Sequence, residues 1–169
     1  MTDAALEALG VAVLTVSDTR TPETDTSGDF LVNAAESAGH QLVERAIVKD
    51  DIYAIRAVVS QWIASPSVEA VLITGGTGFS GRDSTPEAML PLFDKDIPGF
   101  GEVFRQVSYD EIGSSTVQSR AVAGFANRTV IFCMPGSTGA CRTAWNSVLC
   151  EQLDSRHKPC NFVGVLRGH

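Results

Sequence analysis

Short apolar strands separated by helical patterns restrict this chain more than any other feature. Runs rich in Val, Ile and Leu occupy residues 11–16, 42–48, 68–73 and 130–134, and such runs favour buried strands. Strands that are apolar along nearly their whole length indicate a sheet covered on both faces, and helical connections make successive strands parallel. The sequence therefore predicts a single-domain α/β fold, a three-layer α/β/α sandwich with a mostly parallel sheet.

Capping residues locate the helices between these strands. Ser27 is the expected N-cap of the first helix, which ends near Gly39, because Ser caps helix starts and Gly lets the chain leave a helix. Pro86 predicts another helix start, since its fixed φ suits the first turn. Further helical patterns cover residues 52–63, 99–111, 117–124 and 141–153.

The composition is that of one soluble domain. The chain has 169 residues, of which 44% are hydrophobic and 20% charged, and no apolar run approaches the roughly 20 residues that span a bilayer. Residues 1–10 carry acidic but no basic side chains, unlike a signal peptide. We therefore expect a cytoplasmic protein with a flexible tail at residues 1–10, a folded domain at residues 11–169 and no membrane partner.

Charge and cysteine usage exclude further classes of protein. A net charge of −7 disfavours nucleic-acid binding, which needs a basic surface. The four cysteines form no CxxC pair and have no histidine at zinc-ligand spacing, so we expect buried free thiols. The three histidines are expected at the surface, and Trp62 and Trp145 in the core.

Glycine-rich segments follow two of the expected strands. Residues 74–78 read TGGTG and residues 135–139 read PGSTG, while Ser17 and Asp18 follow the first strand. Ligands of such sheets bind beyond the carboxyl ends of the strands, where glycine lets the backbone approach and a helix start offers N–H donors. An anionic ligand such as a phosphate ester fits this pattern, although the glycines can equally serve tight turns alone.

One motif in this region is misleading. Residues 76–81, GTGFSG, match the G-x-G-x-x-G pattern of dinucleotide-binding folds. That pattern belongs at the first strand–helix turn and opens directly into a helix. Here it follows the third strand, and a loop intervenes before the next helix. We therefore predict no NAD site.

Acidic residues stand beside the same strand ends. Asp83, preceded by Arg82, lies between the glycine-rich segment and the expected helix start, and Asp50 follows the second strand. A carboxylate next to a phosphate can carry a divalent cation, and Arg can bind a phosphate through two hydrogen bonds. The alternative is structural: Asp83 caps the next helix, the Arg82–Asp83 pair is solvated, and Asp50 complements a helix dipole.

Several motifs occur in an order that resembles the MoaB/MogA family. They are residues 15–18 (TVSD), 26–28 (TSG), 74–78 (TGGTG), 82–88 (RDSTPEA), 96–102 (DIPGFGE), 119–121 (SRA) and 135–137 (PGS). The resemblance covers residues 10–165, which is almost the whole chain. The segments CRTAW at residues 141–145 and PCNF at residues 159–162 resemble the MoaB branch.

The resemblance implies an activity. Active members of the family transfer AMP from Mg-ATP to the terminal phosphate of molybdopterin, and two aspartates important for this reaction correspond to Asp50 and Asp83. We therefore expect a molybdopterin adenylyltransferase with Asp50 and Asp83 as catalytic residues and Mg²⁺ ligands. The residues expected to bind molybdopterin or the nucleotide are Ser17, Ser27, Gly28, Thr74, Gly75, Gly76, Thr77, Gly78, Arg82, Pro135, Gly136 and Ser137.

The same resemblance leaves an alternative function open and implies an assembly. A paralogue that binds molybdopterin or nucleotide without turnover is the alternative: the intact residues 82–86 favour the enzyme, whereas the MoaB-like tail favours the paralogue. Family members form trimers, which MoaB types pair into hexamers. We therefore expect a homotrimer or homohexamer, with other enzymes of the molybdenum-cofactor pathway as partners. Lys49 stands where the family commonly has proline.

Overall fold

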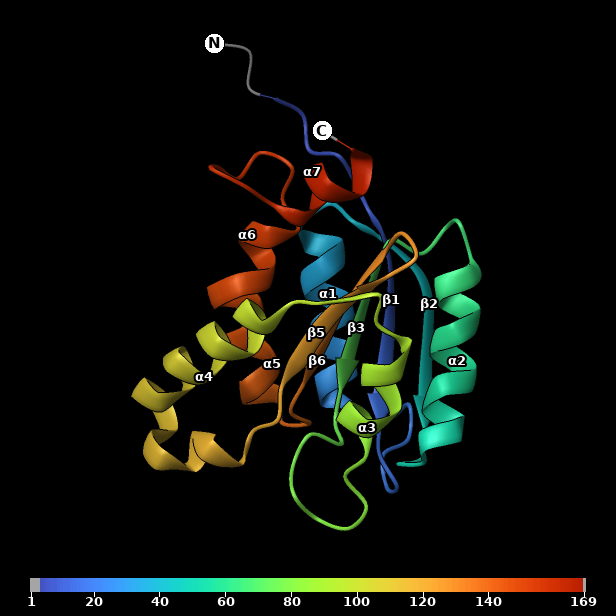
Figure 1. Ribbon diagram of the computed structural model, residues 1–169, viewed down its shortest axis with the longest axis vertical. Helices are drawn as coiled ribbons and strands as arrows, with labels where there is room; N and C mark the ends of the chain where they lie inside the picture. Colours follow the sequence, from blue (N-terminus) through green and yellow to red (C-terminus); the bar gives the residue numbers. More distant parts are fainter. Residues whose placement is uncertain (1–3, 169) are drawn as a thin grey trace.

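The computed structural model describes residues 4–168 and contains one six-stranded sheet (Figure 1). Its strands are β1 (Gly10–Val16), β2 (Gln41–Val48), β3 (Ala70–Thr74), β4 (Lys95–Asp96), β5 (Val122–Ala126) and β6 (Thr129–Met134). They lie side by side in the order β2-β1-β3-β6-β5-β4. The first four in this order run parallel, β5 runs antiparallel to β6, and β4 runs antiparallel to β5. The expected mostly parallel sheet is thus confirmed.

Helices connect and cover these strands. They are α1 (Thr26–Ser37), α2 (Ile52–Ala64), α3 (Thr85–Met89), α4 (Pro98–Ile112), α5 (Thr138–Ala144), α6 (Cys150–Gln152) and α7 (Phe162–Arg167), with 3₁₀ turns η1 (Leu90–Leu92) and η2 (Gly113–Gln118). A π-helical turn, η3 (Trp145–Leu149), joins α5 to α6. The helices expected at residues 52–63, 99–111 and 141–153 are confirmed. Within residues 4–168, no helix has both the length and the apolar character that crossing a bilayer requires.

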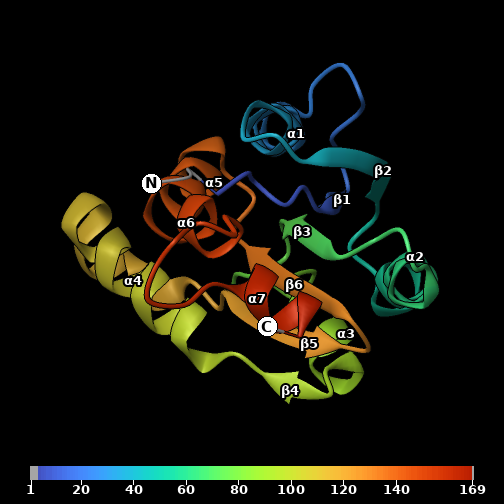
Figure 2. The same ribbon diagram turned by 90° about the horizontal axis from the view of Figure 1, so that it is seen from above.

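The sheet separates two apolar cores, one on each face. Because successive side chains of a strand point to opposite faces, Val13 packs into the core under α1, α4 and α5, whereas Leu14 packs into the core under α2 and α3. Figure 2 shows α1 and α5 on one side of the sheet and α2 on the other. The three layers are therefore confirmed. Trp145 and Trp62, both buried, belong to the first and the second core respectively.

The prediction of a helix at residues 117–124 is wrong. The 3₁₀ turn η2 ends at Gln118, and β5 begins at Val122. Asn127 adopts a positive φ of 55°, so the chain reverses tightly after β5 and pairs it with β6 from Val122 to Ala126. Pairing with a central strand thus overrides the helical tendency of this alanine-containing segment.

The first helix starts at a different cap from the expected one. Its N-cap is Asp25, whose carboxylate accepts the Gly28 N–H at 2.9 Å, whereas Ser27 lies inside the helix. Thr15 and Arg45 also donate to the Asp25 carboxylate, at 2.7 and 3.1 Å. Burial alone raises the pKa of Asp25, but these hydrogen bonds hold that pKa below its usual value. Partners from two strands therefore select Asp25 over Ser27.

Several side chains among residues 4–168 differ from expectation in their burial; His169 lies outside the described residues. Leu9, which we assigned to the flexible tail, is fully buried; residues 1–3 of that tail lie outside the described residues. His40 is buried rather than exposed, because its Nδ1 accepts the Leu9 N–H at 3.1 Å, and burial lowers its pKa. Cys133 and Cys141 are buried free thiols as expected, but Cys150 is only partly buried and Cys160 is exposed. Contacts between Leu9 and His40 thus tie the start of the chain to the domain.

Candidate functional site

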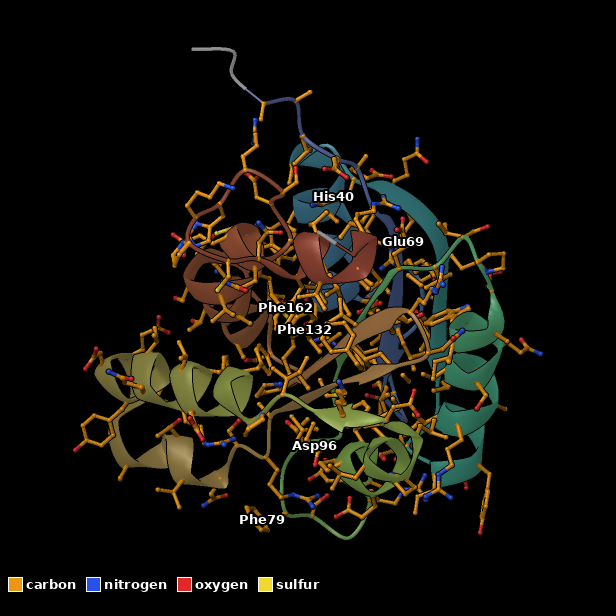
Figure 3. The ribbon with its side chains drawn as sticks, turned by 45° about the horizontal axis from the view of Figure 1, so that its top comes forward. His40, Glu69, Phe79, Asp96, Phe132 and Phe162 are labelled. Carbon is orange, nitrogen blue, oxygen red and sulfur yellow. The ribbon has the colours of Figure 1, made fainter. Side chains whose placement is uncertain are left out.

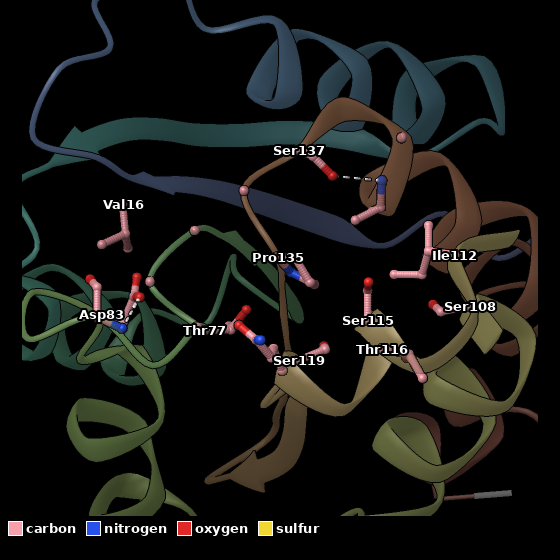
Figure 4. Close-up of a pocket in the computed structure, with 18 of the residues that line it drawn as sticks. Val16, Thr77, Asp83, Ser108, Ile112, Ser115, Thr116, Ser119, Pro135 and Ser137 are labelled. Carbon is pink, nitrogen blue, oxygen red and sulfur yellow. Dashed lines mark hydrogen bonds between the residues drawn. The ribbon is translucent and has the colours of Figure 1, made fainter.

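A cavity of about 630 Å³ opens at the carboxyl ends of β1, β3 and β6 (Figure 4). Its two sides have different origins. The sheet side consists of strand ends and the loops that follow them: Val16, Ser17, Asp18, Asp50, Gly75, Gly76, Thr77, Gly78, Ser80, Arg82, Asp83, Pro135, Gly136 and Ser137. The helix side comes from α4, from η2 with its C-cap, and from α5: Phe104, Ser108, Glu111, Ile112, Ser115, Thr116, Gln118, Ser119, Gly139, Ala140 and Thr143.

The loop between β3 and α3, residues 75–84, needs its first two glycines. Gly75 and Gly76 have positive φ angles of 106° and 71°, which L side chains rarely adopt. A Cβ at Gly75 would overlap the Val16 carbonyl oxygen, and one at Gly76 would overlap the Thr85 hydroxyl. The backbone of this glycine loop therefore passes directly over the end of β1, where its peptide groups line the cavity.

Asp50 supports the fold and lines the cavity at the same time. One carboxylate oxygen, Oδ1, accepts from the backbone N–H of Ser84 at 3.0 Å and from the Ser84 hydroxyl at 2.6 Å. Ser84 is the N-cap of α3 and has no capping bond of its own to the helix. The other oxygen, Oδ2, points toward Gly76, where a Cβ would lie 3.0 Å away. Asp50 thus fixes the start of α3 with one oxygen and faces the glycine loop with the other.

Asp83 keeps more of its hydrogen-bonding capacity. Its Oδ2 accepts the Ser80 N–H at 2.9 Å (Figure 4), and its Oδ1 has no hydrogen-bond partner among residues 4–168. The carboxylate lies beside Gly78, where a Cβ would be 2.7 Å from Oδ2. The alternative that Asp83 caps α3 is wrong, because Ser84 holds the N-cap position. The fold therefore brings Asp50 and Asp83 to the same glycine loop.

Arg82 pairs with Asp18 instead of its neighbour Asp83. Its Nε and Nη2 each donate to an Asp18 carboxylate oxygen at 2.9 Å. The Asp50 backbone N–H donates to the same carboxylate at 3.1 Å. These hydrogen bonds lower the pKa of Asp18 to about 2, and the one from Arg82 has the largest effect. Lys49 does not line the cavity, and its charge makes only a smaller contribution to that lowering.

The charge of the lining bears on what the cavity can hold. Among the described lining residues, four carboxylates (Asp18, Asp50, Asp83 and Glu111) face one cation, Arg82. A polyphosphate is repelled by this set unless a cation accompanies it. No group of three or more His, Cys, Asp or Glu side chains within residues 4–168 is arranged to hold a metal ion. Two carboxylates are nevertheless a donor set that Mg²⁺ uses when water and substrate phosphates complete its shell.

Three of the expected ligand-binding residues lie behind the cavity wall. The Ser27 hydroxyl donates to the Gly136 carbonyl at 2.7 Å, and the Thr74 hydroxyl donates to the Pro135 carbonyl at 2.8 Å. Gly28 is buried and contributes its N–H to Asp25. Ser27 and Thr74 thereby shape the loop after β6, and the other expected residues line the cavity themselves.

The helix side was missed by the sequence analysis. Glu111 lies at the end of α4, and the Thr143 hydroxyl oxygen on α5 is 2.7 Å from its Oε2. Ser119 carries a hydroxyl oxygen that is buried and has no hydrogen-bond partner among the described residues. Three of the quoted segments contain residues of this side, namely Ser119 in SRA, Gly139 in PGSTG and Thr143 in CRTAW, but no binding role was expected for these residues.

Arg120 links the helix side to the glycine loop. Its Nε donates to the Gly78 carbonyl at 2.8 Å, and its Nη2 donates to the Asp83 carbonyl at 3.2 Å. It also pairs with Glu87, whose pKa is lowered by the hydrogen bond from Arg120. Its guanidinium lies 5.1 Å from the centre of the Phe79 ring, which projects from the exposed tip of the loop (Figure 3). Arg120 therefore holds the backbone on both sides of this tip.

Comparison with known proteins identifies the family. A profile described as "Probable molybdopterin binding domain" matches residues 12–155, which include all of the described cavity lining. The chain belongs to the MoaB/MogA family. The resemblance inferred from the motifs is therefore confirmed.

Individual members of the MoaB/MogA family agree with this assignment over most of their length. The chain is 62% identical over 152 residues to molybdenum cofactor biosynthesis protein B of Escherichia coli strain K12, covering 90% of this chain and 89% of that protein. A crystal structure of a molybdenum cofactor biosynthesis protein B superposes with a TM-score of 0.86 at 46% identity, covering 89% and 94% of the two chains. The tungsten cofactor synthesizing protein MoaB from Pyrococcus furiosus superposes with a TM-score of 0.78 at 35% identity, covering 87% and 94%.

Proposed function

We propose that this protein acts in molybdenum cofactor biosynthesis as a molybdopterin adenylyltransferase that uses Mg-ATP. The observation that carries the proposal is Asp83: its carboxylate has one oxygen uncommitted and lies beside Gly78, on the same glycine loop that the fixed carboxylate of Asp50 faces at Gly76. Such a pair, beside cavity-lining backbone at strand ends, suits a metal-bound polyphosphate.

Each group on the sheet side has a definite task in this proposal. The backbone of residues 75–78 receives the phosphates, and Asp83 with Oδ2 of Asp50 would hold Mg²⁺. The metal supplies neutralisation of the polyphosphate charge. The hydroxyl oxygens of Ser17 and Ser137 already accept backbone N–H groups, from Arg20 at 3.0 Å and Ala140 at 3.1 Å. Their protons are therefore available for donation to phosphate oxygens.

The chemistry needs alignment more than a base. An oxygen of the terminal phosphate of molybdopterin forms a bond to the α-phosphorus of ATP, and the bond from that phosphorus to the pyrophosphate oxygen breaks. The nucleophile is already ionised, so no proton has to be removed. The rigid backbone of the glycine loop and the fixed Asp50 supply the preorganisation on which such transfers depend.

An AMP-transfer assay tests this function. The wild-type protein, given molybdopterin and Mg-ATP, should release pyrophosphate and form adenylylated molybdopterin. Asp83→Asn should lower the rate about 100-fold or more, because the charge that faces the metal and phosphates is lost. Asp110→Asn, at an exposed position of α4 that does not line the cavity, is the matched control. Full activity of Asp83→Asn would refute the role of Asp83.

Binding without turnover is the second candidate function. It is favoured by the Arg82–Asp18 ion pair, which occupies the one cation of the described lining. A single-turnover experiment with enzyme in excess over ATP separates the two candidates. Tight molybdopterin binding without any adenylylated product would make the protein a carrier or regulator.

The cellular setting follows from the same proposal. We place the reaction in the cytoplasm, in a homotrimer or homohexamer that works with other enzymes of the molybdenum-cofactor pathway. Light scattering of the purified protein measures the assembly directly. A monomer at micromolar concentration would contradict the oligomer.

A further inference from the structure

The helix side of the cavity has a chemical character of its own. Its described lining contains no cation, one carboxylate (Glu111), several hydroxyl groups and the apolar side chains of Phe104 and Ile112. A phosphate placed here meets an acidic group with no compensating charge. A neutral ring has apolar faces and can carry N–H donors along its edge. The edge can donate hydrogen bonds to the carboxylate, and the faces can pack against the apolar side chains. The helix side is therefore suited to a heterocycle.

Glu111 is held in a defined position. The Thr143 hydroxyl oxygen lies 2.7 Å from Oε2 of Glu111 and 3.0 Å from the Gly139 carbonyl oxygen. Thr143 is itself buried, so the contact ties the end of α4 to α5. Oε1 of Glu111 has no hydrogen-bond partner among residues 4–168. The carboxylate thus faces the cavity with capacity to accept further hydrogen bonds.

Ser119 provides a second, independent observation. Its hydroxyl oxygen is the one buried side-chain nitrogen or oxygen atom without a hydrogen-bond partner among the described residues, and the residue lines the cavity (Figure 4). An unsatisfied buried hydroxyl is costly and calls for an explanation. Rotation about χ1 changes where this hydroxyl points, so a bound polar ring can supply the missing partner.

We propose that Glu111 recognises the pterin ring of the substrate through its 2-amino-4-oxopyrimidine edge, with Ser119 as an additional polar contact. This edge presents an amino group and an adjacent ring N–H side by side, and an ionised carboxylate accepts two such parallel donors. The inference rests on the proposed function, because it places the phosphate end of molybdopterin on the sheet side and the pterin on the helix side. Glu111 is thereby the residue that distinguishes a pterin from a ring without the amino group.

Fluorescence titration with two phosphate-free rings tests this assignment. The probes are 6-hydroxymethylpterin and 6-hydroxymethyllumazine, which carries an oxo group in place of the 2-amino group. Wild-type protein should bind the pterin more tightly, and Glu111→Gln should weaken pterin binding about tenfold or more through loss of a charge-assisted pair of hydrogen bonds. Binding of the lumazine should not weaken in this variant. Ser119→Ala should weaken pterin binding about threefold, as expected for one neutral hydrogen bond.

Asp110→Asn is the matched control, because Asp110 precedes Glu111 on α4 and does not line the cavity. Equal binding of the two rings by the wild type, no binding of either, or unchanged pterin binding by Glu111→Gln would each overturn the assignment. The outcome is separate from that of the AMP-transfer assay. Selective pterin binding without AMP transfer removes only the proposed activity. AMP transfer with an unchanged KM for molybdopterin in Glu111→Gln removes only the role of Glu111.

Discussion

The two sides of the cavity differ in how far their polar groups are already satisfied. On the sheet side, Asp18 pairs with Arg82, and Asp50 bonds to Ser84. On the helix side, Glu111 retains an uncommitted oxygen and the Ser119 hydroxyl has no partner among the described residues. The sheet side therefore serves the fold and the site together, whereas the helix side keeps polar groups in reserve. Apart from Asp83, whose Oδ1 is also uncommitted among the described residues, substitutions on the sheet side should cost stability, and those on the helix side should cost ligand binding.

The largest effect is expected at Gly75. Gly75→Ala forces an L residue to a φ of 106° and drives its Cβ into the Val16 carbonyl oxygen, so the free energy of unfolding should fall by about 3 kcal/mol or more. Gly81→Ala lies in the same loop, where a Cβ would meet no atom within 4 Å, and is the control. Urea denaturation measures both. Similar values for the two variants would mean that the loop is not tied to β1 as described.

Substitution of Asp50 and of Asp83 should affect the stability of the fold to different extents. Asp50→Ala removes both hydrogen bonds to the N-cap of α3 and should lower the free energy of unfolding by about 2 kcal/mol. Asp83→Ala loses only an exposed bond to the Ser80 N–H, so its cost should stay below about 1 kcal/mol. Thermal and urea unfolding of the two variants, made side by side, check this difference. An equally large loss of unfolding free energy in both variants would show that Asp83 also stabilises the fold.

Arg120 joins the two sides, and its removal should loosen the glycine loop without unfolding the domain. Arg120→Met keeps the length of the side chain but loses the hydrogen bonds to the Gly78 and Asp83 carbonyls. We expect a loss of about 1–2 kcal/mol. Amide hydrogen exchange at residues 78–83 should become about tenfold faster, since local opening then requires less free energy. Arg128→Met, in the exposed turn between β5 and β6, should leave exchange in the loop unchanged. Equal exchange in both variants would show that Arg120 does not hold the glycine loop in place.

The sheet side was open to prediction because its position follows from topology. In a parallel sheet the carboxyl ends of the strands meet at one edge, so the glycines of residues 74–78 and the acids Asp50 and Asp83 could be placed together from the sequence. The helix side offered no comparable rule. Glu111 and Ser115 have the polar pattern of a solvated helix end, and only the packing of α4 against α5 brings Glu111 to Thr143.

The same limit explains the errors in the fold. The four parallel strands have apolar patterns that are evident locally, whereas β5 depends on its pairing with β6 across Asn127. Asp25 and Ser27 are equally good caps by residue type, and the choice between them is made by Thr15 and Arg45, which come from other elements. Where a distant partner decides between two local options, sequence pattern alone does not contain the answer.

The smallest effect on stability is expected at Ser119, and its sign is informative. Ser119→Ala removes a buried hydroxyl oxygen that has no partner among the described residues. Because burying an unsatisfied hydroxyl costs free energy, the variant should be as stable as the wild type or more stable by up to about 1 kcal/mol. Thr85→Val is the contrasting change, since the buried Thr85 hydroxyl donates to the Gly75 carbonyl at 2.7 Å, and it should be destabilising. If Ser119→Ala lowers the free energy of unfolding as much as Thr85→Val does, its hydroxyl contributes to the fold, and the helix side holds no polar group in reserve there.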